Sequence, residues 1–202
     1  MTTTVKIEYR PAPALERILR ALPAEETRHR LASEGASSAA GSVAKYLRAL
    51  SASRHATASS LGATPTQVIG RTASGVKAEE RDGAAVVVVP HPLFRRAFRD
   101  IEIAPQKAAS LAIPIHRLAY GRSPRTIAGL FLFKAKGQAF LAKSEGKRPR
   151  KTVCYYLLHR GRVLQPRDET LLPSQDTLAL SAKAGVSRFL AGLFLSSSQH
   201  PT

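Results

Sequence analysis

The chain has 202 residues, of which 44% are hydrophobic and 22% are charged, so it can bury a substantial core and is not a disordered protein. Its 31 Lys and Arg outnumber its 14 Asp and Glu, giving a formal net charge of +17. The excess is local, because residues 91–167 hold seventeen Lys and Arg against three Asp and Glu. This density favours contact with DNA, RNA or an acidic protein, and the alternative is a solvated basic surface.

Cysteine content and hydropathy argue against two classes of protein, those stabilised by intrachain disulfides and those that span a membrane. Cys154 is the single cysteine, so no intrachain disulfide can form, and its apolar neighbours favour a buried thiol. There is no apolar run of about 18 residues, and the N-terminus lacks an apolar signal core. We therefore expect no membrane contact and synthesis in the cytoplasm.

The first quarter of the chain predicts a short strand followed by a long helix. The strand is indicated by apolar residues that alternate with polar ones, Val5, Ile7 and Tyr9. Residues 14–22 could add a helical turn or two. Pro23 suits the first turn of a longer helix reaching about Ser51, with Glu25 and Glu26 favourable at its positive end.

The middle of the chain predicts a loop, a second helix and a central strand. Residues 54–66 are rich in Ser, Ala, Thr and Gly and indicate a loop, and Thr64 is expected to cap a helix over 65–78. The β-branched run 84–89 predicts a buried central strand. A basic loop over 91–100 follows it. Two aromatic residues are expected to anchor this loop, Phe94 and Phe98.

Short strands and a hairpin are expected next. Residues 101–103 and 111–115 predict strands, the second with Pro114 at its end or at a sheet edge because proline donates no ladder hydrogen bond. Residues 130–133 and 139–142 flank Lys136-Gly137-Gln138, a pattern typical of a hairpin. A basic excursion over 143–151 leads to a buried strand from 152 to 158, whose continuation reaches Leu164.

The C-terminal part predicts a turn over 166–170, a helix opened by Pro173 and Ser174, and a frayed tail. One helix face carries Leu178, Ala182, Val186, Phe189 and Leu193. We expect this helix, through Val186 and Phe189, to pack on a single core sheet containing Val86, Val88, Leu111, Ile113, Val153, Tyr155 and Leu157.

The predicted class is α+β, with a long N-terminal helix, a mostly antiparallel sheet and a C-terminal helix packed on it. We expect the chain to divide into an N-terminal strand and helical region over 1–53, an α+β body over 54–195 and a disordered tail over 196–202.

Motifs that would carry catalysis are missing from the sequence. Gly-x-Ser-x-Gly does not occur, and Gly146-Lys147 lacks the upstream glycine and the following Ser or Thr of a phosphate loop. The six histidines are scattered without metal-ligand spacing, and a turn or capping role is expected for Asp168-Glu169. We therefore expect no enzyme, no metal and no cofactor, with a small enzyme such as a nuclease as the alternative.

The basic residues are the remaining candidates for a site. Five of them fall within nine residues, Lys143, Lys147, Arg148, Arg150 and Lys151. We expect these, together with Arg122 and Arg125, to contact DNA or a neighbouring subunit. Gly146 and Pro149 interrupt the cluster, which suits phosphate contact and does not suit base readout. The neighbouring aromatic residues are expected in the core rather than as stacking platforms.

Three segments together resemble a known family. The first runs over 101–121 and contains Ile103, Pro105, Leu111, Ile113 and Pro114, followed by Ala119-Tyr120-Gly121. The second contains Val163, Pro166, Asp168, Leu172, Pro173 and Ser174, and the third is the loop 61–66. In order and spacing they resemble the phage neck and tail-completion proteins, often called virion morphogenesis proteins, over roughly residues 25–195.

The resemblance implies an α+β structural protein of a tailed phage or prophage-like particle that forms a homo-oligomeric ring at the head–tail junction or tail end. It implies location in the virion, with portal, adaptor or tail-terminator proteins as partners and genomic DNA passing through the ring. The basic loop 143–151 is unusually long for the family, so the resemblance assigns it no role. The alternative is a non-specific nucleic-acid-binding protein of a host or mobile element.

Overall fold

A computed structural model describes residues 25–81, 84–106, 108–146 and 151–197, with side chains as far as residue 192. The chain forms two compact units that are discontinuous in sequence. Unit 1 comprises 1–50, 69–99 and 167–202, and unit 2 comprises 51–68 and 100–166. The expected linear division into 1–53, 54–195 and 196–202 stays a prediction. The expected strand at 5–9, the helical turn at 14–22 and most of the expected tail lie outside the described residues.

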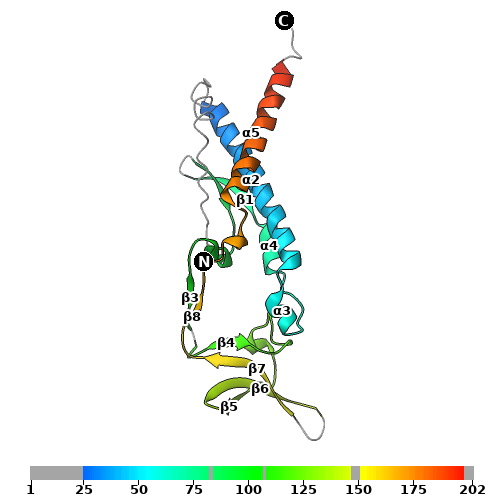
Figure 1. Cartoon of the computed structure of the whole chain (residues 1–202), viewed down its shortest axis with the longest axis vertical. Coiled ribbons are helices and arrows are strands. Elements are labelled where there is room, and N and C mark those ends of the chain that lie inside the picture. The colour runs from blue at the N-terminus through cyan, green and yellow to red at the C-terminus, as the bar shows by residue number, and fades with distance from the viewer. Residues whose placement is uncertain (1–24, 82–83, 107, 147–150, 198–202) are drawn as a thin grey trace. The chain divides into compact units, whose positions relative to one another are not determined.

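Unit 1 is built around a long helix, α2 (Glu25–Ser53), which confirms the helix expected from Pro23 to about Ser51. Glu25 and Glu26 lie in its first turn, where carboxylates favour the positive end of the helix dipole. Leu31, Val43 and Leu47 are at most 1% exposed on its inner side. Figure 1 shows α2 as the blue-to-cyan helix beside the orange-to-red C-terminal helix.

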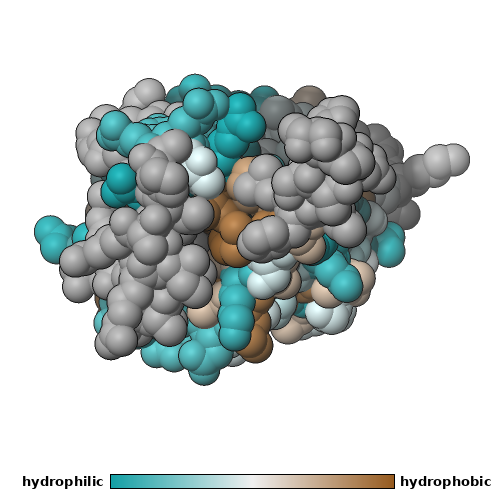
Figure 2. All heavy atoms as spheres, turned by 90° about the horizontal axis from the view of Figure 1, so that it is seen from above, coloured by the Kyte–Doolittle hydropathy of each residue, from teal (hydrophilic) through white to brown (hydrophobic). Residues whose placement is uncertain are grey.

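The C-terminal helix, α5 (Gln175–Ser197), approaches α2 closely through small residues. Ser174 caps α5 as expected, because its Oγ accepts a hydrogen bond from the Thr177 N–H at 3.3 Å. A Cβ atom added at Gly185 would lie 2.7 Å from the Glu34 carbonyl oxygen and 2.6 Å from the Ser38 Cβ. The backbones of the two helices therefore meet where no side chain fits. Seen from above in Figure 2, a small hydrophobic patch lies near the centre of the view, with hydrophilic residues above and below it.

Replacing Gly185 by alanine is expected to destabilise unit 1 by about 1–3 kcal/mol, because the new methyl group must push α2 away. Gly192 on the same helix is the matched control, since a Cβ added there meets no atom within 4 Å. Alanine at position 192 should leave stability unchanged or raise it by up to about 1 kcal/mol through its better helix propensity. Urea unfolding followed by circular dichroism measures both effects, and equal stabilities of the two variants would contradict the close helix contact.

The core of unit 1 joins both helices to a two-stranded sheet. β1 (Lys77–Arg81) pairs antiparallel with β2 (Ala84–Val88), and α4 (Val68–Ser74) and the 3₁₀ helix η1 (Pro92–Ala97) lie before and after this sheet in the chain. One cluster of buried residues contains Ala39, Ala40, Val43, Leu47, Ala73, Val87, Val89, Phe94, Ala97, Leu171, Leu172, Leu178 and Ala182. The structure confirms the α+β class, because it has a long N-terminal helix, antiparallel sheets and a C-terminal helix that shares this core.

The prediction of one core sheet was wrong. The described strands form a two-stranded sheet in unit 1, and a two-stranded and a four-stranded sheet in unit 2. Val86 and Val88 pair with the adjacent strand β1, whereas the other five expected members belong to the four-stranded sheet. Phe189 is only partly buried, and Val186 packs against Gly35 of α2, at 3.3 Å from the Cβ position there, rather than on the expected sheet.

Three local predictions also need correction. The expected loop 54–66 contains the short helix α3 (Ala56–Ser60). Thr64 is not a cap, since the next helix begins only at Val68. Of the two expected aromatic anchors, Phe94 is fully buried but Phe98 is 51% exposed, because the 3₁₀ turn η1 directs only the first into the core.

Unit 2 contains two antiparallel sheets. β3 (Ile101–Ile103) pairs with β8 (Val163–Gln165), and the larger sheet has the order β4-β7-β6-β5. Its members are β4 (Leu111–Pro114), β5 (Phe131–Ala135), β6 (Gln138–Glu145) and β7 (Lys151–His159). Pro114 lies on an edge strand as expected. The expected hairpin is confirmed, with positive φ at Lys136 (50°) and Gly137 (74°), as a two-residue turn of this kind requires.

The basic excursion predicted over 143–151 is shorter than expected. Residues 143–145 continue β6, and β7 already begins at Lys151, so that Lys143, Ser144 and Glu145 pair with Val153, Thr152 and Lys151. Residues 147–150 lie outside the described part of the chain. In the described residues, no helix has the length and apolar character needed to cross a membrane.

Candidate basic interface

Positive charge is concentrated in unit 2. The sequence of this unit contains fourteen Lys and Arg against three Asp and Glu, a net +11, whereas unit 1 contains seventeen against eleven, a net +6. Unit 2 is also the smaller of the two. The field that would attract a polyanion therefore originates mainly from the unit that carries the four-stranded sheet.

A β-bulge shapes one face of this sheet. Leu141 of β6 pairs with Tyr156 and the next residue, Ala142, pairs with Cys154, so Tyr155 is an extra residue in β7. The bulge brings two consecutive tyrosines, Tyr155 and Tyr156, into one buried cluster with Ala119. Both are at most 3% exposed. We call this side of the sheet the covered face, because the segment 115–130 packs on it through Ala119, Ile127 and Leu130.

Tyr156 holds the segment that carries two of the predicted site residues. Its hydroxyl lies 3.2 Å from the Ala119 carbonyl oxygen and 3.0 Å from that of Arg122. Gly121 adopts a φ of 71°, which suits glycine, and a Cβ atom there would lie 2.6 Å from Thr66 Cγ2. The backbone at Arg122 is therefore held against the sheet, while the side chains of Arg122 and Arg125 remain exposed.

Lys143 and Lys151 lie on the same covered face as this segment. The Lys143 Cε is 3.6 Å from the Cβ position of Gly129, so its side chain lies over the segment. Lys143 pairs with Val153, and Glu145 pairs with Lys151, which makes the two lysines diagonal neighbours. The structure thus brings Arg122, Arg125, Lys143 and Lys151 to one side of the sheet, and we call these four residues the basic surface. Lys147, Arg148 and Arg150 lie outside the described residues.

None of the four residues of the basic surface has a salt-bridge partner among the described residues. The nearby carboxylate of Glu145 accepts a hydrogen bond from the Tyr155 hydroxyl. By contrast, Arg162 of the same unit pairs with Glu102 at 2.7 Å. Sequence reasoning missed further exposed cations of unit 2, Arg117, Lys134, Lys136 and Arg160. Their charge was counted in the basic excess, but no local motif singled them out.

The two buried tyrosines are expected to make the stability of unit 2 sensitive to alkaline pH. The hydrogen bond to Glu145, followed by burial, raises the Tyr155 pKa above its ordinary 10.0. Burial also raises the Tyr156 pKa, against a smaller opposing effect of the Arg122 charge.

We expect the stability of unit 2 to fall as pH rises above about 10, because the unfolded state then loses protons that the folded state keeps. Below pH 10 both states are protonated and this contribution is fully present. Urea unfolding at pH 8 and at higher pH should show a smaller decline in Tyr155→Phe than in the wild type. An identical decline in the two proteins would contradict the assignment.

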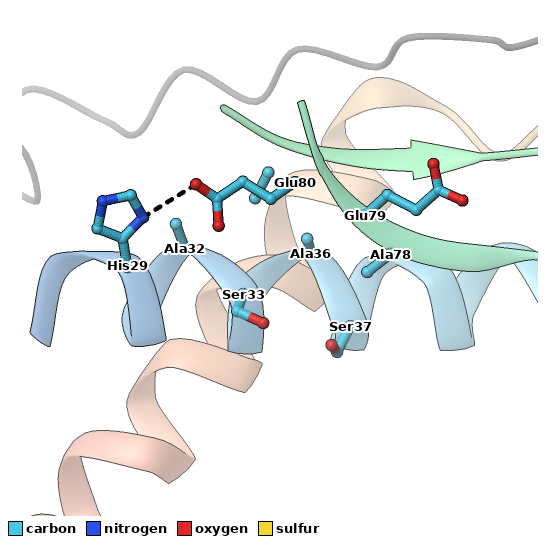
Figure 3. Close-up of a pocket in the computed structure, with 9 residues that line it drawn as sticks. His29, Ala32, Ser33, Ala36, Ser37, Ala78, Glu79 and Glu80 are labelled. Carbon is cyan, nitrogen blue, oxygen red and sulfur yellow. Dashed lines mark ion pairs between the residues drawn. The ribbon is translucent and has the colours of Figure 1, made fainter. Parts of the chain in front are cut away.

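A shallow pocket in unit 1 is a weaker candidate. Figure 3 shows it between α2 and β1, lined mostly by small side chains, with His29 and Glu80 at one end. His29 Nδ1 lies 3.2 Å from Glu80 Oε1, and about half of each side chain is exposed. Glu79 instead pairs with Lys77 and Arg81, which lower the pKa of its carboxyl group. These charges are satisfied by one another, and the pocket lacks a nucleophile paired with a base.

A further titratable residue, Asp168, has a structural role. Asp168 caps the 3₁₀ helix η3 (Glu169–Leu171), since its Oδ1 accepts the Thr170 N–H at 3.2 Å, which confirms the expected capping role. Cys154 is a free, partly buried thiol. Within the described ranges, no three His, Cys, Asp or Glu residues gather where they could hold a metal ion.

No family model, curated protein or solved structure matches this chain.

Proposed function

We propose that the chain is a non-enzymatic structural protein of a tailed phage or prophage-like particle, a ring-forming subunit at the head–tail junction or tail end. The observation that carries the proposal is the basic surface, four cations without carboxylate partners among the described residues, on the more highly charged unit. The resemblance of segments 101–121 and 163–174 to phage neck and tail-completion proteins supports the same assignment.

A basic surface on a sheet is suited to a DNA path. Lys and Arg side chains contact phosphates without reading bases, so a genome of any sequence can pass. Arg122 projects from backbone that the Tyr156 hydroxyl bonds, and Arg125 follows in the short 3₁₀ helix Pro124–Thr126. The partners we propose are further copies of this chain, portal, adaptor or tail-terminator proteins, and genomic DNA, without a cofactor.

A second candidate function is non-specific nucleic-acid binding outside a virion, which the same cations would also favour. Assembly separates the two. Mass photometry and analytical ultracentrifugation of the purified chain over a range of concentrations should show a closed oligomer of one size for the ring subunit. A protein that remains a monomer or dimer and binds DNA tightly at low salt would support the second candidate and contradict the first.

We predict no catalytic turnover, because sequence and described structure contain no nucleophile–base pair or phosphate loop. Purified protein incubated with linear and circular DNA and Mg²⁺ or Mn²⁺ should leave both substrates intact. Metal-dependent cleavage that disappears when one Asp or His is replaced would overturn the prediction and favour the nuclease alternative.

A further inference from the structure

The four-stranded sheet of unit 2 has an apolar strand at its edge. β5 pairs with β6, and the described residues provide no strand on its other side. Phe131 is 40% exposed and Leu132 is 58% exposed on this strand. An edge strand with free backbone groups and exposed apolar side chains is an aggregation risk that proteins normally cover or charge.

The face of the sheet opposite to Tyr156 is apolar next to this edge. Cross-strand pairs join one residue from each strand into a row, Phe133, Phe140, Leu157 and Ile113. All four side chains are partly exposed, so nothing described in unit 2 fully covers them. The row carries no charge although the unit has a net charge of +11. This apolar row and the β5 edge are therefore suited to a strand of protein and not to DNA.

The chain itself contains a segment with the complementary pattern. Residues 4–10 alternate apolar side chains, Val5, Ile7 and Tyr9, with charged ones, Lys6, Glu8 and Arg10. If this segment were added beside β5, its apolar residues could continue the apolar row. Its charged residues would then lie on the side of Leu132 and Lys134. In a parallel register with Ile7 opposite Phe133, Glu8 lies opposite Lys134. Residues 11–24 connect the segment to α2 and can span about 45 Å when extended.

We propose that residues 4–10 of one copy add as a strand to the β5 edge of a neighbouring copy. Strand addition satisfies the free backbone groups of the edge and takes its specificity from the alternating side chains. A contact between two different surfaces repeats from copy to copy and closes a ring when the rotation allows it. The inference rests on the proposed ring function, and the experiment below separates the two.

Disulfide trapping in the full-length chain tests the contact. Cys154→Ser first removes the natural thiol, and Ile7→Cys and Phe133→Cys are then placed in separate chains. Mixed under mild oxidation, they should form a disulfide-linked dimer, because opposed cross-strand residues have a Cβ separation close to that of a disulfide. Lys6→Cys is the matched control, since its side chain should point to the opposite face, and it should cross-link much less. Phe131→Cys replaces Phe133→Cys if the latter fails to fold.

The outcomes are distinct. Rings without a cross-link to Phe131→Cys or Phe133→Cys would overturn the inference and leave the proposed function intact. A chain that carries both cysteines and forms only an intramolecular disulfide would also overturn it, because the segment then docks on its own sheet. Cross-linked chains that never form a closed ring would support the strand contact and contradict the ring function.

Discussion

Replacing Phe94 by alanine is expected to lower the free energy of unfolding by about 3–5 kcal/mol. The side chain is fully buried in the core that joins α2, β2 and α5. Its ring also makes an edge contact with His91, with ring centroids 6.4 Å apart and planes at 84°. Truncation removes these contacts and leaves a cavity that the surrounding helices can fill only in part. Urea or thermal unfolding followed by circular dichroism measures the loss.

Phe98→Ala is the matched control, because Phe98 lies four residues further along and is 51% exposed. We expect this change to alter stability by less than about 1 kcal/mol, as for most surface substitutions. If both variants lose the same stability, the core of unit 1 is not the one described.

Neutralising the basic surface is expected to have the largest effect on DNA binding. The variant replaces Arg122, Arg125, Lys143 and Lys151 by glutamine, which keeps much of each aliphatic stem. Each phosphate contact that is lost should reduce the slope of log K against log salt concentration by about 0.9. The wild type should bind duplexes of different sequence equally, with affinity that falls steeply as salt increases. Fluorescence anisotropy at several salt concentrations measures both properties.

The matched control removes the same charge from unit 1 through four exposed cations, Lys45, Arg48, Arg71 and Lys183. Because net charge changes equally, only the position of the charge differs between the two variants. We expect the control to retain most of the wild-type affinity and salt slope. Equal losses of DNA affinity in the two variants would mean that DNA binding depends on net charge alone, which would contradict a defined basic surface.

A second variant addresses the basic residues that follow Gly146 in the sequence, up to the start of β7, and replaces Lys147, Arg148, Arg150 and Lys151 by serine. We expect a shallower salt dependence and an intact fold. If DNA binding keeps its slope while ring formation is lost, these residues contact a neighbouring subunit instead. Normal affinity together with normal assembly would leave a solvated surface loop as the interpretation.

Local patterns in the sequence predicted the elements whose signals are themselves local. The Lys136-Gly137 turn, the Ser174 cap and the edge position of Pro114 follow from the backbone properties of the residues concerned. The long helix α2 was likewise predicted from Pro23, the two glutamates and helical spacing.

Strand partners and burial were harder to predict, because they depend on residues far apart in the chain. The run 84–89 indicated a central strand, yet among the described strands β2 pairs with its neighbour β1 alone, and it is buried by α2 and α5 instead. Phe94 and Phe98 have the same chemistry, and only the 3₁₀ turn separates a buried ring from an exposed one. The bulge at Tyr155, which gathers two tyrosines under segment 115–130, has no sequence signal of its own.

Immunogold electron microscopy of particles released by cells that carry this gene tests the central proposal most directly. An antibody against the purified chain should label each particle at a single place, the head–tail junction or the tail end. Particles made without the gene should show heads and tails that fail to join, or tails with an unfinished end. Particles from cells with the gene that carry no label at either place would contradict the account. Particles that assemble and infect normally without the gene would contradict it as well.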